Sequence, residues 1–315
     1  MLSGKITDEI FNSILPTYQL ERAYDWYSSH GSPDEQVQIL IYLGRSYFAD
    51  GDYDKAMSIY TNALDIAGKN KLNNLIGYTY DYIGDLYREK FMFTEAIKKY
   101  ETAAECFKKE NNTDSYACAL KNIGREYACI DSLSCAIEIL TIADSVAANT
   151  KDIEVTASIN NALGNIYVMR EEYDKAEKYF LKALSTGKEK MPDYVALIDL
   201  YTTTDSIDKA KELLSKIPQD DPQYTCSINY LYYQIHNAER DYKEALAYLE
   251  EYVDMVDSIV YADSQSKILN IESKYNHLKI SQEVDRLKIK QQSYIIFSVI
   301  CISCLLLICL LYTSD

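Results

Sequence analysis

The sequence contains few residues that interrupt helices. Only 10 glycines and 5 prolines occur among its 315 residues, and neither type is found after Pro222. These are the residues that most often end or kink a helix, so the C-terminal part favours long uninterrupted helices. Runs of alternating apolar and polar residues long enough for a strand are also missing. The sequence therefore predicts an all-α chain.

Residues arranged for catalysis or metal binding are equally scarce. The three histidines, His30, His236 and His277, lie far apart and have no zinc-ligand or Cys-His spacing. There is no glycine-rich phosphate loop and no Gly-x-Ser-x-Gly motif. Cys301 and Cys304 have a CxxC spacing, but their apolar surroundings offer no charge to stabilise a thiolate. We therefore expect no enzyme activity, no bound metal and no cofactor.

Charge and cysteine content exclude two further classes of protein. The formal net charge of −16 argues against direct contact with nucleic acid. The N-terminus, MLSGKITDEIF, lacks the basic start and apolar run of a signal peptide. Five cysteines outside the apolar C-terminal segment are an odd number at irregular spacings, so we expect buried thiols rather than disulfides. They are Cys106, Cys118, Cys129, Cys135 and Cys226.

What the sequence does contain is a motif that recurs every forty residues. In each copy a tyrosine stands three residues after a glycine, and an alanine stands twelve residues after it. The glycines are Gly44, Gly84, Gly124 and Gly164; the tyrosines are Tyr47, Tyr87, Tyr127 and Tyr167; the alanines are Ala56, Ala96, Ala136 and Ala176. Four copies at one fixed interval indicate a repeat protein.

The residue types explain how each copy folds. Small side chains are needed where two antiparallel helices approach closely, and a large side chain fills the space beside them. The large residues stand sixteen positions after each glycine: Tyr60, Tyr100, Leu140 and Phe180. One such helix pair cannot bury its apolar face alone, so neighbouring pairs are expected to stack into an α-solenoid.

These residues carry a family resemblance. The pattern Leu-Gly-x-x-Tyr, followed by alanine, an aromatic residue and alanine, resembles the tetratricopeptide repeat. Residues 51–56, Gly-Asp-Tyr-Asp-Lys-Ala, are similar to that family's turn between its two helices. The forty-residue period exceeds the usual length of about 34, and resembles the longer-helix repeats of bacterial membrane-anchored and peptide-sensing regulators. The resemblance implies a tetratricopeptide-type α-solenoid of antiparallel helix pairs.

The pattern also predicts how the chain is divided. An N-terminal helical hairpin, acting as a partial or capping repeat, precedes an array of four clear repeats and one degenerate repeat. A degenerate last repeat, a long stalk helix, a transmembrane helix and a short tail follow. The predicted segments are 1–36, 37–217, 218–260, 261–292, 293–312 and 313–315, in that order.

The stalk carries a short coiled-coil-like seam of Ile268, Ile271, Tyr275 and Leu278. Such a seam suits a helix that pairs with a second copy in a homodimer, or one that packs back on its own array. Two heptads do not distinguish these alternatives.

The apolar segment at 293–312 predicts a single membrane span. Residues 294–312, YIIFSVICISCLLLICLLY, are nineteen residues without a charge, and a helix of this length spans about 28 Å, close to a bilayer core. Basic residues precede it, among them Arg286, Lys288 and Lys290, and no Lys or Arg follows. If the chain is complete, the positive-inside rule places the array in the cytoplasm, at a bacterial plasma membrane.

A second reading of the same order of segments remains open. Array, stalk and span in succession resemble bacterial membrane proteins whose array lies outside and whose DNA-binding or kinase domain follows the span. On that reading the chain is the sensor arm of a truncated signalling receptor or transcriptional regulator. A scaffold that assembles a membrane complex is a further alternative.

The resemblance also implies where a ligand binds. In this family the first helix of each repeat lines a concave groove, at the position after the glycine and one turn before it. The corresponding residues are Ile41, Arg45, Asp81, Asp85, Lys121, Arg125, Asn161 and Asn165. We expect a protein or peptide ligand, with an acidic group over Lys121, Arg125 and the two asparagines and a basic group over the two aspartates.

Overall fold

The computed structural model describes residues 17–150, 152–188, 190–219, 221, 223–261, 265, 279, 282–283 and 286–296. Its two compact units, 1–261 and 262–315, are described separately. Within the described ranges all regular structure is helical and no strand occurs. The predicted all-α fold is therefore confirmed for this part of the chain.

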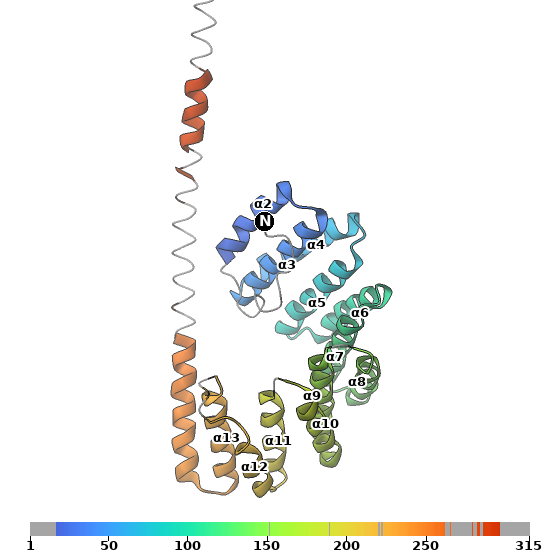
Figure 1. The fold of residues 1–315 in the computed structure, drawn as a ribbon, viewed down its shortest axis with the longest axis vertical. Helices are drawn as coiled ribbons and strands as arrows, with labels where there is room; N and C mark the ends of the chain where they lie inside the picture. Colours follow the sequence, from blue (N-terminus) through green and yellow to red (C-terminus); the bar gives the residue numbers. More distant parts are fainter. Residues whose placement is uncertain are drawn as a thin grey trace, which may run out of the picture. The chain divides into compact units, whose positions relative to one another are not determined.

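The first unit consists of successive antiparallel helices (Figure 1). They are α2 (Thr17–His30), α3 (Pro33–Ala49), α4 (Tyr53–Lys69), α5 (Asn73–Glu89), α6 (Phe93–Lys109), α7 (Thr113–Cys129), α8 (Leu133–Ala147), α9 (Ile153–Met169), α10 (Tyr173–Thr186), α11 (Met191–Thr203), α12 (Ile207–Leu214) and α13 (Thr225–Ala238). A further helix covers residues 242–261.

Each of the four clear repeats is a helix pair held at close range by its glycine. The pairs are α3–α4, α5–α6, α7–α8 and α9–α10. A Cβ atom placed on Gly44 would lie 2.3 Å from the ring of Tyr60, and one on Gly84 would lie 2.5 Å from the ring of Tyr100. Such distances are too short for any side chain, so only glycine allows this packing.

The third and fourth repeats have the same construction. A Cβ atom on Gly124 would lie 2.6 Å from Leu140 Cγ, and one on Gly164 would lie 2.4 Å from the ring of Phe180. The large residues of the second helices are fully buried. The contact between glycine and large residue thus recurs every forty residues, as the sequence motif does.

The turns within the repeats share one backbone geometry. The amides of Asp52, Met92, Ser132 and Glu172 donate to the carbonyls of Tyr47, Tyr87, Tyr127 and Tyr167 at 2.8–2.9 Å. One residue before each donor has positive φ: Gly51 at 79°, Phe91 at 57°, Asp131 at 59° and Glu171 at 60°. This is a helix C-cap with a left-handed residue, and it reverses the chain in each repeat.

The first helices of the repeats form one layer and the second helices another. Helix α3 packs against α5, α7 against α9, and α11 against both α9 and α13. In Figure 1 the helices of residues 17–238 succeed one another along an arc, with α4, α6, α8 and α10 on its outer side. The inner layer therefore consists of the helices that carry the residues predicted for the groove.

Several expectations fall outside the described residues or differ from what is observed. Residues 1–16, the seam of the predicted stalk and most of the predicted span at 293–312 lie outside the described part. Among described residues, no helix combines the length and apolarity needed to cross a bilayer. The expectation of buried thiols is wrong, because Cys129 and Cys135 are exposed and Cys106, Cys118 and Cys226 are only partly buried.

Candidate functional site

A concavity of about 590 Å³ lies over α7, α9 and the start of α11. Four residues that the sequence predicts for the groove line it together: Lys121, Arg125, Asn161 and Asn165. Among the other lining residues are Glu126, Cys129, Glu154, Met169, Pro192 and Asp193. A second concavity of about 670 Å³ continues over α11 and α13, and it shares Asn161, Asn165 and Pro192 with the first.

Helical periodicity sets the order of side chains in the first concavity. Lys121, Arg125 and Cys129 follow one another at intervals of four along α7, and Asn161, Asn165 and Met169 do the same along α9. Residues four apart share a helix face. Because α7 packs against α9, the concavity has two rows of side chains, called below the α7 row and the α9 row.

The two cations of the α7 row are not neutralised by ion pairs. Neither Lys121 nor Arg125 makes a salt bridge within 4.0 Å among the described residues. Lys121 lies near Asp81, whose pKa its charge lowers. Arg125 is exposed, and the second helix of its repeat has the apolar Leu140 behind Gly124. Both cations are therefore available to an anionic group.

The two amides of the α9 row are held by hydrogen bonds. Asn161 Nδ2 donates to Asp193 Oδ1 at 2.7 Å, and Asn165 Nδ2 donates to Asn161 Oδ1 at 2.9 Å. Burial raises the pKa of Asp193, and the hydrogen bond from Asn161 opposes that effect. The sequence pattern did not indicate Asp193, because it belongs to the degenerate fifth repeat and comes close only through packing.

A buried acid borders the same concavity. Glu126 is 2% exposed, and its Oε1 lies 4.0 Å from Arg88 Nε, while its Oε2 has no hydrogen-bond partner among described residues. Burial raises the pKa of Glu126, and the charges of Arg88 and Arg125 lower it. The contact of Glu126 with Arg88 joins the second and third repeats, and neither of these two residues was indicated by the sequence pattern.

The predicted acidic residues of the second repeat are already engaged. Asp81 Oδ1 accepts from Asn122 Nδ2 at 3.2 Å. Asp85 Oδ1 accepts from Tyr100 Oη at 2.7 Å and pairs with Arg88 Nη2 at 3.4 Å. Burial and the neighbouring Asp85 carboxylate raise the pKa of Asp81 to about 7. These carboxylates chiefly hold neighbouring helices together.

The groove positions of the first repeat differ from expectation. Arg45 lies with its guanidinium carbon 5.2 Å from the centre of the Tyr82 ring, a cation–π contact between repeats. Ile41 is 5% exposed and packs in the core with Val37 and Leu40. The inclusion of Ile41 among groove residues is therefore wrong, because an isoleucine at this position gains more from burial than from facing solvent.

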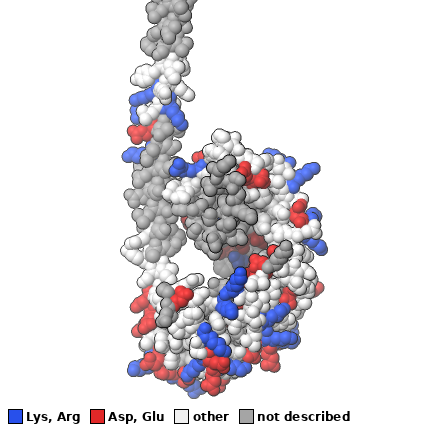
Figure 2. All heavy atoms as spheres, viewed as in Figure 1, with Lys and Arg blue, Asp and Glu red and all other residues white. Residues whose placement is uncertain are grey.

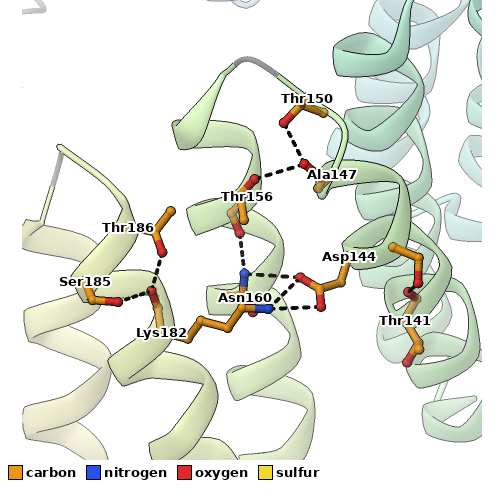
Figure 3. A network of polar contacts seen from close by, with 10 residues as sticks. Thr141, Asp144, Ala147, Thr150, Thr156, Asn160, Lys182, Ser185 and Thr186 are labelled. Carbon is orange, nitrogen blue, oxygen red and sulfur yellow. Dashed lines mark hydrogen bonds and ion pairs between the residues drawn. The ribbon is translucent and has the colours of Figure 1, made fainter.

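A polar network supports the α9 row from behind (Figure 3). Asp144 of α8 accepts from Lys182 Nζ of α10 with both oxygens at 3.0 Å, and from Asn160 Nδ2 of α9 at 3.3 Å. Asn160 Nδ2 also donates to the carbonyl of Thr156 at 2.6 Å. The network thus links the second helix of the third repeat to both helices of the fourth.

Charges of both signs are interspersed on the face drawn in Figure 2 rather than gathered into one patch. Within the described part of the chain, no group of three or more His, Cys, Asp or Glu side chains could hold a metal ion. The first concavity thus combines two cations, two amides, three carboxylates (Glu126, Glu154 and Asp193) and apolar surface.

Comparison with known families identifies the repeats. Two models of the tetratricopeptide repeat match the chain, one at residues 40–73 and the other at residues 156–191. The chain therefore contains tetratricopeptide repeats, and the predicted repeat family is confirmed. No curated protein matches the sequence.

Solved structures share this architecture at low sequence identity. Pseudomonas aeruginosa pilF is 18% identical with a TM-score of 0.54, over 75% of this chain and 99% of that one. BtubC from P. vanneervenii is 16% identical with a TM-score of 0.51, over 78% and 91%. A Rap protein complexed with competence and sporulation factor is 16% identical with a TM-score of 0.58, over 80% and 72%. At these identities the likeness shows the fold alone, an α-solenoid of tetratricopeptide type.

Proposed function

We propose that this chain is a non-catalytic binding protein that holds an acidic segment of a protein or peptide over its third and fourth repeats. The observation that carries the proposal is the pair Lys121 and Arg125, which share a concavity and have no ion-pair partner among the described residues. Arginine can hold a carboxylate through two parallel hydrogen bonds, and lysine adds a second positive charge.

The amides of the α9 row complete the proposed site. An asparagine side chain both donates and accepts, so Asn165 can pair with the backbone of an extended ligand. Asn161 is fixed by Asp193 and in turn accepts from Asn165, which orders the row before a ligand arrives. The Rap protein of similar fold is complexed with competence and sporulation factor, which supports ligand binding as a role for this architecture.

The groove residues of the second repeat are less available to a ligand than those of repeats three and four. The aspartates of the second repeat are engaged by Asn122, Tyr100 and Arg88. We therefore propose that the ligand binds over repeats three and four, and that it needs no basic group over repeat two.

The test is charge reversal at the site. The full-length chain and its Arg125→Glu variant, each purified in detergent micelles, are titrated with a labelled peptide containing two glutamates. We expect at least a tenfold loss of affinity, because one attraction becomes a repulsion. We expect the melting temperature to change little, because Arg125 is exposed.

A matched control is Lys178→Glu, which makes the same change of charge. Lys178 is exposed on α10 and lines neither concavity. If both variants lose affinity equally, the effect is one of net charge and not of this site. If neither loses affinity, the site does not bind acidic groups.

We also propose that residues 293–312 anchor the scaffold in a bacterial plasma membrane, with residues 261–292 as a stalk that connects the two. The support is the uncharged nineteen-residue segment and the basic residues before it. Protease accessibility of the array in intact cells would determine its side of the membrane. Retention in carbonate-washed membranes, lost on deletion of 293–315, would test the anchor.

A further inference from the structure

The first concavity changes character along its length. The α7 row reads Lys121, Arg125, Cys129, and the α9 row reads Asn161, Asn165, Met169. Both rows are polar at their first two positions and apolar at the third. The concavity therefore ends, beside the turns that follow α7 and α9, in an apolar surface.

That apolar end is exposed and is specific to these repeats. Met169 is 53% exposed, and Cys129 is exposed as well. Ala162 and Ile166 line the concavity beside them. The corresponding positions of the first two repeats are Ala49 and Glu89. A large exposed methionine next to a cationic row offers contact area to an apolar side chain.

The spacing of the rows matches an extended peptide. Residues four apart on a helix are separated by about 6 Å along its axis. Alternate residues of an extended strand, which point to the same side, are separated by about 6.6 Å. Over three successive positions the two spacings differ by only about 1 Å, so every second ligand residue can face one position of the rows.

We propose that the site recognises an extended peptide segment with two acidic residues and one large apolar residue at alternating positions, acid-x-acid-x-apolar. The acids face Lys121 and Arg125, and the apolar side chain lies between Cys129 and Met169. This inference rests on the proposed function, and it adds the register and the chemical class of the third ligand residue.

The site should have little preference for the residues between the two acids and the apolar residue of the ligand. In an extended segment they point away from the rows, toward solvent. The inference therefore predicts sensitivity to the position of the apolar residue rather than to overall composition. Moving that residue by one place turns it to the opposite side of the peptide.

The experiment compares labelled peptides by fluorescence anisotropy with the full-length chain in detergent micelles. The in-register probes are GSEGEGLGS and its reversed order GSLGEGEGS, since the rows accommodate either chain direction. The register-shifted probe is GSEGELGGS, and the acid-free probe is GSQGQGLGS. We expect the tighter in-register probe to bind at least fivefold better than the shifted one, and the acid-free probe not to bind measurably.

Variants locate the apolar contact. Met169→Gln keeps the length of the side chain and should abolish the preference for the in-register leucine. The same variant should weaken binding of the leucine-free peptide GSEGEGGGS much less than it weakens binding of the in-register peptide. Met92→Gln is the control, because Met92 is also exposed but lies outside both concavities.

The outcomes separate the two proposals. If no peptide binds in an acid-dependent way, the proposed function fails. If binding depends on the acids but is equal for in-register and shifted leucine, only the present inference is overturned. A register preference that survives Met169→Gln unchanged also overturns it.

Discussion

The first helices of repeats one and two and those of repeats three and four have the same place in the fold but use their groove positions differently. In the earlier pair, Asp85 is held by Tyr100 and Arg45 lies against Tyr82. In the later pair, Lys121 and Arg125 have no ion-pair partner among described residues. A repeat position can therefore stabilise the stack or remain available to a ligand.

One contribution to this difference comes from the second helix. Tyr100 packs under Gly84, and its hydroxyl reaches the groove residue Asp85 at 2.7 Å. The equivalent residues of repeats three and four, Leu140 and Phe180, have no hydroxyl group. Among described residues, no hydroxyl group of the second helix contacts Arg125 or Asn165, and Asn165 donates to Asn161 of its own helix instead.

The largest expected effect comes from filling the space at the glycines. Gly84→Ala should lower the free energy of unfolding by about 2 kcal/mol, because the Cβ would meet a buried ring whose hydroxyl is bound to Asp85. Gly124→Ala should cost about half as much, because Leu140, although also fully buried, makes no hydrogen bond that would break if it shifted. Urea unfolding followed by circular dichroism measures both.

Gly68→Ala is the control for these substitutions. It lies in α4, and a Cβ there would meet no atom within 4 Å. It should stabilise the protein by roughly 0.5–1 kcal/mol through helix propensity alone. If Gly84→Ala and Gly124→Ala destabilise the protein equally, the hydrogen bond from Tyr100 to Asp85 does not make repeat two more sensitive than repeat three.

The next effect is a pH dependence at Asp81. Its pKa is raised to about 7 in the folded protein, against about 3.9 in an unfolded chain. Between these values Asp81 binds a proton more readily in the folded protein, so the contribution of this one group to stability is fully present below pH 4 and is lost as the pH rises through 7. Asp81→Asn should flatten this dependence and stabilise the protein by about 1.5 kcal/mol at pH 8.

Asn at position 81 can still accept the hydrogen bond from Asn122, so the substitution removes a charge without removing the contact. Thermal unfolding of both proteins at pH 5 and pH 8 measures the effect. If the variant is no more stable than the original protein at pH 8, ionisation of Asp81 does not destabilise the folded state and the prediction is wrong.

The smallest effect is expected from the hydroxyl that engages Asp85. Tyr100→Phe should cost about 1 kcal/mol, since a hydrogen bond to a carboxylate is lost while the ring remains. Phe180 at the same position of repeat four shows that a phenylalanine fits there. Tyr78→Phe removes a more exposed hydroxyl that contacts Ser115 and Asn112 but no charged group, and it should cost less than Tyr100→Phe. If the two substitutions cost the same, the hydrogen bond from Tyr100 to Asp85 does not stabilise repeat two more than a hydrogen bond between uncharged groups does.

The fold was predictable because its contacts repeat with the sequence. A glycine and a large residue sixteen positions apart meet in every clear repeat, so their spacing alone predicts the helix pair. The turn was less obvious from residue types. Phe91 and Glu171 adopt the left-handed conformation that Gly51 adopts in the first repeat, although glycine is the residue usually expected there.

The candidate site was predictable only in part. Register predicted that Lys121, Arg125, Asn161 and Asn165 lie together, and they line one concavity. It did not predict the burial of Ile41, which depends on the chemistry of the side chain rather than on its position. Nor did it predict the hydrogen bond from Asn161 to Asp193, because that contact joins residues of different helices across an imperfect repeat.

The bridge formed by Asp144, Asn160 and Lys182 has a mechanical consequence. It fastens the outer helix of repeat three to both helices of repeat four, directly behind the two facing rows. The bridge therefore limits the movement of repeat four relative to α8, and it helps to hold α9, the helix that carries the α9 row, in place. A row of side chains that is already held in place loses little conformational entropy when a ligand binds.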